Sequence, residues 1–248
     1  MDYLVHHGTK GMKWGVRRYQ NKDGTWTEAG LNRRRANRNI KRGKSYNIDN
    51  WGSDKDHNVL YIIGNSGSGK STTAKGMASN NDSVIHLDTM LEEKPHGKTD
   101  FNKDFDDFLR SKNVPVDKMR DDTIPKQERW DAITAMADQV EAYGEHCFKQ
   151  GKKVIIEGVQ MGDDTMFPDK NYFDGKAVIL LETNYKRDTT RAGIRDGLTI
   201  EDIDNDINDS ELEEWYDYIS SNLTKISKLN EKYVDSGEKE VDKILNKN

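Results

Sequence analysis

A glycine-rich segment at residues 64–71 has the residue types and the spacing that bind a phosphate group. It reads GNSGSGKS and matches the pattern G-x-x-x-x-G-K-[ST] at every fixed position. Glycines let successive backbone N–H groups turn toward one anion, and a following helix N-terminus adds partial positive charge. Lys70 can then reach the β- and γ-phosphates of a nucleotide, and the Ser71 hydroxyl can bind Mg²⁺. The residues expected to bind the nucleotide are Gly64, Asn65, Ser66, Gly67, Ser68, Gly69, Lys70, Ser71 and Thr72.

The elements on either side of this segment are those that a phosphate loop requires. An apolar, β-rich run at Val59–Ile63 predicts a buried strand directly before it, and residues 72–78 predict a helix directly after it. A loop between a strand and a helix N-terminus is well placed to hold an anion. The alternative is a glycine-rich turn that matches the pattern by chance.

Two further apolar runs each end in an acidic residue. Residues 84–88 end in Asp88, and residues 152–158 contain Glu157 next to a glycine. Ligands of parallel sheets gather at the carboxyl ends of strands, so we expect both carboxylates beside the glycine loop. There Asp88 can accept a proton from an acceptor hydroxyl or orient a metal, and Glu157 can join Ser71 and Asp88 at Mg²⁺. The alternatives are an Asp that caps the next turn and an ordinary acid at a strand end.

A fourth apolar run, residues 177–182, precedes three arginines spaced four residues apart. On a helix, this spacing places Arg187, Arg191 and Arg195 on one face. Facing the nucleotide, they would clamp a transferring phosphoryl group. We expect this role for Arg191 and Arg195, because Arg187 comes early after the strand. The alternative is a solvated helix face.

The segment between the second and third predicted strands is polar at first and then helical. Residues 91–125 are expected to form the region that recognises an acceptor substrate, although their sequence does not identify that substrate. Pro125 is placed to open a helix that Gly151 closes. Cys147 falls on the apolar stripe of that helix, so we expect a buried thiol rather than a nucleophile.

The composition excludes several classes of protein. Only 33% of the 248 residues are hydrophobic, and no apolar run approaches the ~20 residues that span a bilayer. We therefore expect no membrane association, and no secretory signal is apparent. A single cysteine excludes an internal disulfide and suits the reducing cytoplasm.

Charge is distributed unevenly along the chain. Residues 1–50 contain 12 Lys and Arg against 4 Asp and Glu, whereas residues 51–248 contain 27 against 40. A basic arm on an acidic body can bind nucleic acid, an acidic partner or its own body. We therefore predict an α/β protein with a mostly parallel central sheet, a helical insertion and C-terminal helices. Its three parts are a basic arm at 1–50 with one short helix over Glu28–Arg42, a nucleotide-binding domain at 51–200, and a helical extension packed on the core at 201–248.

The predicted core resembles P-loop small-molecule kinases, especially uridine kinase and phosphoribulokinase-like enzymes. The resemblance covers residues 58–200 and is carried by the glycine loop, the acid at the second strand and the arginine-bearing helix. It implies a three-layer P-loop NTPase sandwich and transfer of the ATP γ-phosphoryl group to a hydroxyl, with ATP and Mg²⁺ as cofactors. It also implies that Asp88 is the base and that Arg191 and Arg195 belong to a lid over ATP, acting with Lys70 in catalysis.

The run Ile156-Glu157-Gly158 is similar to one in zeta toxins, which phosphorylate a UDP-amino sugar, and in polynucleotide 5′-kinases. A nucleoside, a nucleotide or a nucleotide sugar is therefore the expected small-molecule acceptor. The alternatives are a polynucleotide 5′-kinase and, from other classes, a P-loop ATPase without a small acceptor and a phage head-associated docking protein that only binds nucleotide.

The N-terminal residues 3–30 resemble a segment found on head-associated and other structural proteins of tailed phages and prophages. The resemblance is dense over the motif HHGTKGMKWGVRRY and its continuation. It implies a phage or prophage origin, docking to a phage structural protein through residues 1–30, and a location in the host cytoplasm or on the virion. The aromatic residues among the basic ones, Trp14, Tyr19 and Trp26, would also suit nucleic acid.

Overall fold

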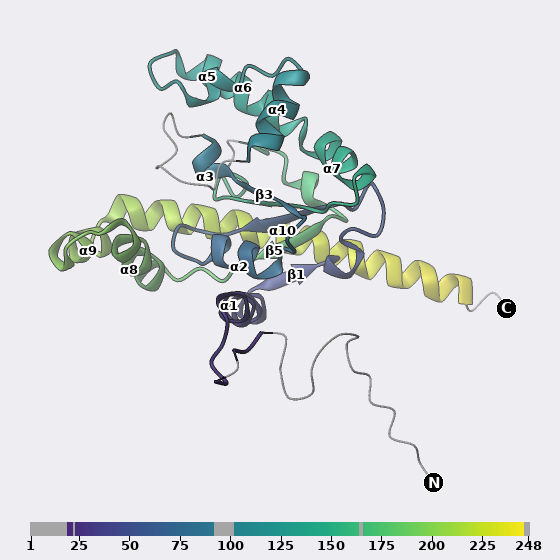
Figure 1. Cartoon of the computed structure of the whole chain (residues 1–248), viewed down its shortest axis with the longest axis horizontal. Helices are drawn as coiled ribbons and strands as arrows, with labels where there is room; N and C mark the ends of the chain where they lie inside the picture. The colour runs from purple at the N-terminus through teal and green to yellow at the C-terminus, as the bar shows by residue number, and fades with distance from the viewer. Residues whose placement is uncertain (1–18, 22, 92–101, 164–165, 246–248) are drawn as a thin grey trace, which may run out of the picture.

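The protein is an α/β structure built on a five-stranded mixed sheet, as the computed structural model shows (Figure 1). The structure describes residues 19–21, 23–91, 102–163 and 166–245. The strands lie in the order β1-β5-β2-β4-β3. Four of them run parallel and β1 pairs antiparallel with β5 at one edge. Their bounds are β1 Lys44–Tyr46, β2 Val59–Ile63, β3 Ser83–His86, β4 Val154–Glu157 and β5 Ala177–Leu180. The predicted α/β class is therefore confirmed.

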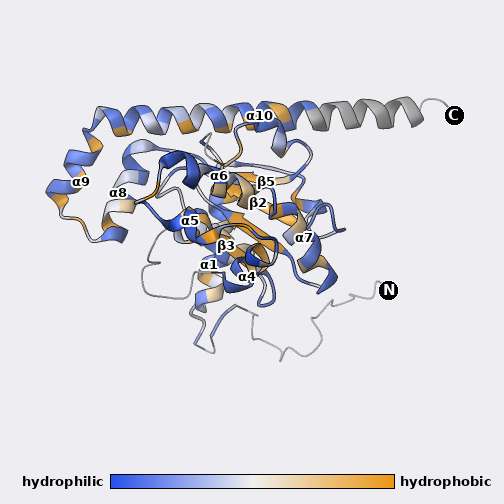
Figure 2. Cartoon of the chain, turned by 90° about the horizontal axis from the view of Figure 1, so that it is seen from above, coloured by the Kyte–Doolittle hydropathy of each residue, from blue (hydrophilic) through white to orange (hydrophobic). Residues whose placement is uncertain are grey.

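The sheet is apolar on both faces because helices cover both of them. All five residues of β2 are buried, and they alternate between two apolar clusters. Tyr61 and its neighbours two residues away face one cluster, and Leu60 and Ile62 face the other. Figure 2 shows the strands as the most hydrophobic part of the interior, with hydrophilic residues predominating on the surrounding helices.

The helices divide between the two faces and one end of the sheet. Beside the Leu60 face lie α1 Glu28–Arg42 and α2 Lys70–Met77. The Tyr61 face packs against α3 Leu87–Met90, α4 Lys103–Ser111, α5 Val116–Arg120, α6 Lys126–Ala137, α7 Val140–Lys149 and part of α10 Ser210–Leu245. The helices α8 Tyr185–Asp196 and α9 Ile200–Ile207 project together at one end (Figure 1).

Two local expectations differ from the structure. The second parallel strand ends at His86 rather than Asp88, because the chain turns at once into the short helix α3. The single helix expected between Pro125 and Gly151 is divided into α6 and α7. At the division, Gln139 N–H donates to the Met136 carbonyl at 3.0 Å, a three-residue step that tightens the turn and redirects the chain. Cys147 on α7 is buried as predicted.

The described part of residues 1–50 is built into the body of the protein. Helix α1 occupies the range predicted for it and packs along α2, and β1 forms the edge strand of the sheet. The predicted contact of residues 1–30 with a phage structural protein lies largely outside the described residues. At the other end of the chain, Ile219 and Ile226 bury one face of α10 against the core. No helix within the described ranges is long and apolar enough to cross a membrane.

Candidate functional site

The order of the strands places a crevice at the carboxyl end of β2. From β2, the chain forms β3 and β4 on one side and then crosses to form β5 on the other. In open α/β sheets, such a point of reversal is where ligands bind. The glycine loop follows β2 here, beside a cavity of about 440 Å³. The cavity is lined by Arg35, Arg38, Asn39, Arg42, Gly67, Gly69, Lys70, Ser71, Thr72, Asp88, Arg191 and Arg195.

Two glycines of the loop have backbone angles and close neighbours that disfavour a side chain. Gly67 and Gly69 have φ angles of 74° and 101°, a region that side chains rarely adopt. A Cβ on Gly67 would lie 1.9 Å from the Asp188 carbonyl oxygen of α8, and one on Gly69 would lie 2.6 Å from Asn39 Nδ2 of α1. The loop therefore packs between α8 and α1.

Lys70 begins α2 directly after the loop. Its side chain is buried, and its Nζ donates a hydrogen bond to the Asn65 carbonyl oxygen at 3.0 Å. The ammonium group is thereby held across the loop that precedes it. A buried cation at this point can be matched by the phosphates of a nucleotide.

The exposed Ser71 and the buried Glu157 form a pair beside Lys70. The Ser71 hydroxyl donates to Glu157 Oε1 at 2.8 Å, and His86 Nδ1 lies 2.5 Å from the same oxygen. Burial opposes ionisation of Glu157, but the His86 hydrogen bond, the charge of Lys70 and the Ser71 hydrogen bond together hold its pKa below the ordinary value. The carboxylate therefore stays ionised at neutral pH.

These residues fit Mg²⁺. The second carboxylate oxygen of Glu157, Oε2, is buried and has no hydrogen-bond partner. The Ser71 hydroxyl contacts the other oxygen of that carboxylate, and Asp88 lies on the wall of the same cavity as Ser71. Within the described ranges, no group of three or more His, Cys, Asp or Glu side chains gathers as a metal cluster. Mg²⁺ usually takes one or two carboxylates and completes its shell with phosphate oxygens and water, so Glu157 and Asp88 are enough carboxylates for it.

His86 was not anticipated from the residue pattern. It lies opposite Glu157 in the register between β3 and β4. Aligning the two predicted strands by their closing acids would have paired Asp88 with Glu157, so the pattern gave no signal for His86, which takes that position because β3 ends two residues earlier than expected.

Asp88 lies in the first turn of α3 and lines the cavity from the side of the sheet. Its Oδ1 accepts a hydrogen bond from Gln160 Nε2 at 2.7 Å. The negative charge of Asp88 acts on Arg195: the hydrogen bonds that Arg195 donates to Asp196 raise the pKa of Arg195 above its ordinary value, and the charge of Asp88 adds to the effect. Asp88 thus combines exposure to the cavity with a fixed orientation.

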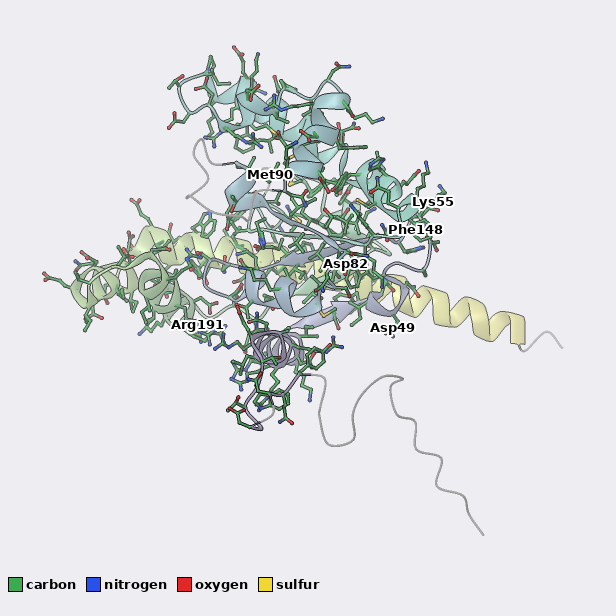
Figure 3. The ribbon with its side chains drawn as sticks, viewed as in Figure 1. Asp49, Lys55, Asp82, Met90, Phe148 and Arg191 are labelled. Atoms are coloured by element: carbon green, nitrogen blue, oxygen red, sulfur yellow. The ribbon has the colours of Figure 1, made fainter. Side chains whose placement is uncertain are left out.

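The three arginines of α8 separate into two groups. Arg187 is held by the Glu182 carboxylate at 3.0 Å and the Asp188 carboxylate at 2.7 Å, and it does not line the 440 Å³ cavity. Arg191 and Arg195 both line it. In Figure 3, Arg191 lies between α8 and α1. The guanidinium groups of α8 that face the cavity are therefore the two expected from the sequence.

The cavity collects only part of the predicted nucleotide-binding set. Gly67, Gly69, Lys70, Ser71 and Thr72 line it. Four other residues of the loop, Gly64, Asn65, Ser66 and Ser68, do not. Two of these instead shape the loop through their carbonyl oxygens, Asn65 by accepting from Lys70 and Ser66 by accepting from Tyr216 at 3.0 Å.

Residue patterns did not anticipate that α1 would form a wall of this cavity. Arg35, Arg38 and Arg42 all line it, together with Asn39. The signal was present in the spacing of three and four residues, which places the three arginines on one helix face. What the sequence did not indicate is that this face points toward the glycine loop.

Comparisons with known proteins bear only on the N-terminal segment. A model of a family of unknown function, DUF7211, matches residues 1–21. Neither a comparison with curated proteins nor one with solved structures found a match. The matched segment ends before α1, so the cavity must be interpreted from its own chemistry.

Proposed function

We propose that the protein is an ATP-dependent phosphotransferase with a P-loop NTPase fold, which moves the γ-phosphoryl group to a hydroxyl of a small acceptor. The observation that carries the proposal is the meeting of three parts of the chain at one cavity. The glycine loop with Lys70 and Ser71 contributes a phosphate cradle, α3 contributes the carboxylate of Asp88, and α8 contributes Arg191 and Arg195.

Each residue has a defined part in the proposed reaction. The acceptor oxygen attacks the γ-phosphorus, its proton passes to the Asp88 carboxylate, and the bond to the β-phosphate oxygen breaks to release ADP. Lys70 and the two arginines of α8 stabilise the charge on the transferring group. Ser71 and Glu157 would hold Mg²⁺, which when bound neutralises phosphate charge.

The test is transfer of radiolabel from γ-labelled ATP with Mg²⁺ to a panel of nucleosides, nucleoside monophosphates, UDP-amino sugars and 5′-hydroxyl oligonucleotides. We expect one acceptor class to become labelled, with Lys70→Ala and Asp88→Asn both inactive. Lys149→Ala, an exposed lysine at the end of α7, is the charge control and should remain active. ATP hydrolysis with no labelled acceptor would contradict the proposal and favour an ATPase.

A further inference from the structure

Helix α1 packs against α2 and the glycine loop, which fixes its position. Ala36 of α1 is fully buried, and a Cβ on Gly76 of α2 would lie only 2.5 Å from the Ala36 Cβ. Asn39 Nδ2 donates to Thr73 Oγ1 at 3.1 Å and to the Gly69 carbonyl oxygen at 3.4 Å. The close helix contact and the hydrogen bonds hold α1 in one register beside the loop.

This register directs one set of arginines into the cavity and another away from it. Arg35, Arg38 and Arg42 line the cavity. Arg33 and Arg34 do not, and their guanidinium carbons lie over the rings of Tyr19 and Trp26, 5.6 Å and 4.7 Å from the centroids. The two sets therefore have different environments on the same helix.

The cavity-lining arginines of α1 have no carboxylate partner among the described residues. No ion pair within those ranges involves Arg35, Arg38 or Arg42, whereas Arg187 and Arg195 of α8 are each paired. Guanidinium groups that line a cavity without an acidic partner are suited to a ligand that carries the negative charge.

The charge of the cavity exceeds what one nucleotide would balance. Its lining contains six cationic side chains and a single carboxylate, that of Asp88. Lys70, Arg191 and Arg195 suffice for the phosphates and the transferring group in the proposed reaction. Arg195 is already paired with Asp196 and the Glu157 carboxylate lies beside Lys70, but a magnesium-bound nucleoside triphosphate would still leave part of the positive charge unbalanced. Because the arginines of α1 have no acidic partner of their own among the described residues, this excess points to a second anionic group beside them in the same cavity.

We propose that Arg35, Arg38 and Arg42 form a second anion subsite that binds a phosphate group of the acceptor. This inference rests on the proposed function and narrows its substrate class: the acceptor is a small molecule that already carries a phosphate or diphosphate. Within the expected acceptors, it selects nucleotides and nucleotide sugars over free nucleosides.

The test is calorimetric titration of inorganic phosphate into the full-length protein saturated with Mg²⁺ and a non-hydrolysable ATP analogue. We expect one phosphate site, weakened about tenfold or more by Arg38→Gln/Arg42→Gln, because the variant loses charge-assisted hydrogen bonds and a tenfold change corresponds to only about 1.4 kcal/mol. The matched control is Arg34→Gln/Lys41→Gln, which removes the same charge from the same helix outside the cavity lining. The control should retain phosphate affinity within about threefold.

Several results would overturn the inference. They are an absence of phosphate binding to the nucleotide complex, an equal loss in the control, and competition between phosphate and the nucleotide analogue. Competition would show that the arginines of α1 serve the phosphates of the nucleotide itself. A second readout compares a nucleoside with its 5′-monophosphate as acceptor: Arg38→Gln/Arg42→Gln should raise the KM of the monophosphate selectively, and equal use of both acceptors would also refute the inference.

Failure of the proposed function can be distinguished experimentally from failure of the anion subsite. Calorimetry needs no turnover, so the subsite can be measured even where no acceptor is labelled. If the protein binds no nucleotide, the phosphotransferase proposal fails, and phosphate is then titrated into the free protein. Binding that depends on Arg38 and Arg42 in that titration supports the anion subsite, and its absence overturns it.

Discussion

Substitution of Gly67 by alanine tests the packing of the glycine loop against α8. The new Cβ would lie 1.9 Å from the Asp188 carbonyl oxygen, so loop and helix must separate by about 1.5 Å to reach ordinary contact near 3.4 Å. The backbone at φ 74° adds a strain of about 1–2 kcal/mol, and overpacking adds about 1–3 kcal/mol. We expect the free energy of unfolding to fall by about 2–5 kcal/mol.

Gly151→Ala is the matched control for this substitution. Gly151 has a φ of 69°, and nothing lies within 4 Å of where its Cβ would be, so its alanine variant bears the backbone strain without the overlap. Urea denaturation followed by circular dichroism measures both variants. The difference between them isolates the contact between the loop and α8.

Separation of the glycine loop from α8 in Gly67→Ala should also weaken nucleotide binding. A shift of about 1 Å in a catalytic arrangement can cost about a hundredfold in rate, so Gly67→Ala should also bind the ATP analogue at least about tenfold more weakly. The Gly151→Ala variant should bind it normally. If both variants lose the same stability and bind the analogue equally, then α8 does not press on the loop and the geometry argued for Arg191 is wrong.

Three further outcomes are expected. Asp88→Asn should abolish phosphoryl transfer but leave the dissociation constant of the ATP analogue within about threefold, because Asp88 is proposed to act on the acceptor proton; loss of both would contradict that role. Folding lowers the pKa of Glu157 below its ordinary value of 4.5, so ionised Glu157 stabilises the fold fully above pH 4.5. This stabilisation is lost as the pH falls through the pKa that Glu157 has in the folded protein. In the absence of metal, the free energy of unfolding of Glu157→Gln should therefore fall less with decreasing pH than that of the unsubstituted protein. An unchanged pH profile would argue against the contacts of Glu157 with His86 and Ser71. Burial raises the pKa of the Cys147 thiol, so a thiol reagent at pH 8 should modify the native protein far more slowly than the urea-unfolded protein, and equal rates would contradict burial.

Residues 59–78 show which elements can be predicted from the pattern of neighbouring residues. A continuous apolar run, a glycine loop and a helix are properties of neighbouring residues, so β2 and α2 lie where they were expected. The same holds for α1, β4 and β5. The end of β3 and the division between α6 and α7 were missed, because each depends on how the chain packs after the pattern ends.

The composition of the candidate site was decided by contacts between distant segments. The sequence predicted the glycine loop, the two strand-end acids and the arginines of α8 as site residues, because the carboxyl ends of parallel strands lie at one edge of a sheet. The pairing of His86 with Glu157 required the register of two strands separated by some seventy residues. The arginines of α1 entered the cavity because Ala36 packs on Gly76, a fit between two small residues that no local pattern encodes. The amino-acid sequence thus determined which chemical groups the protein carries, and close packing between helices distant in the sequence determined which of them face one cavity.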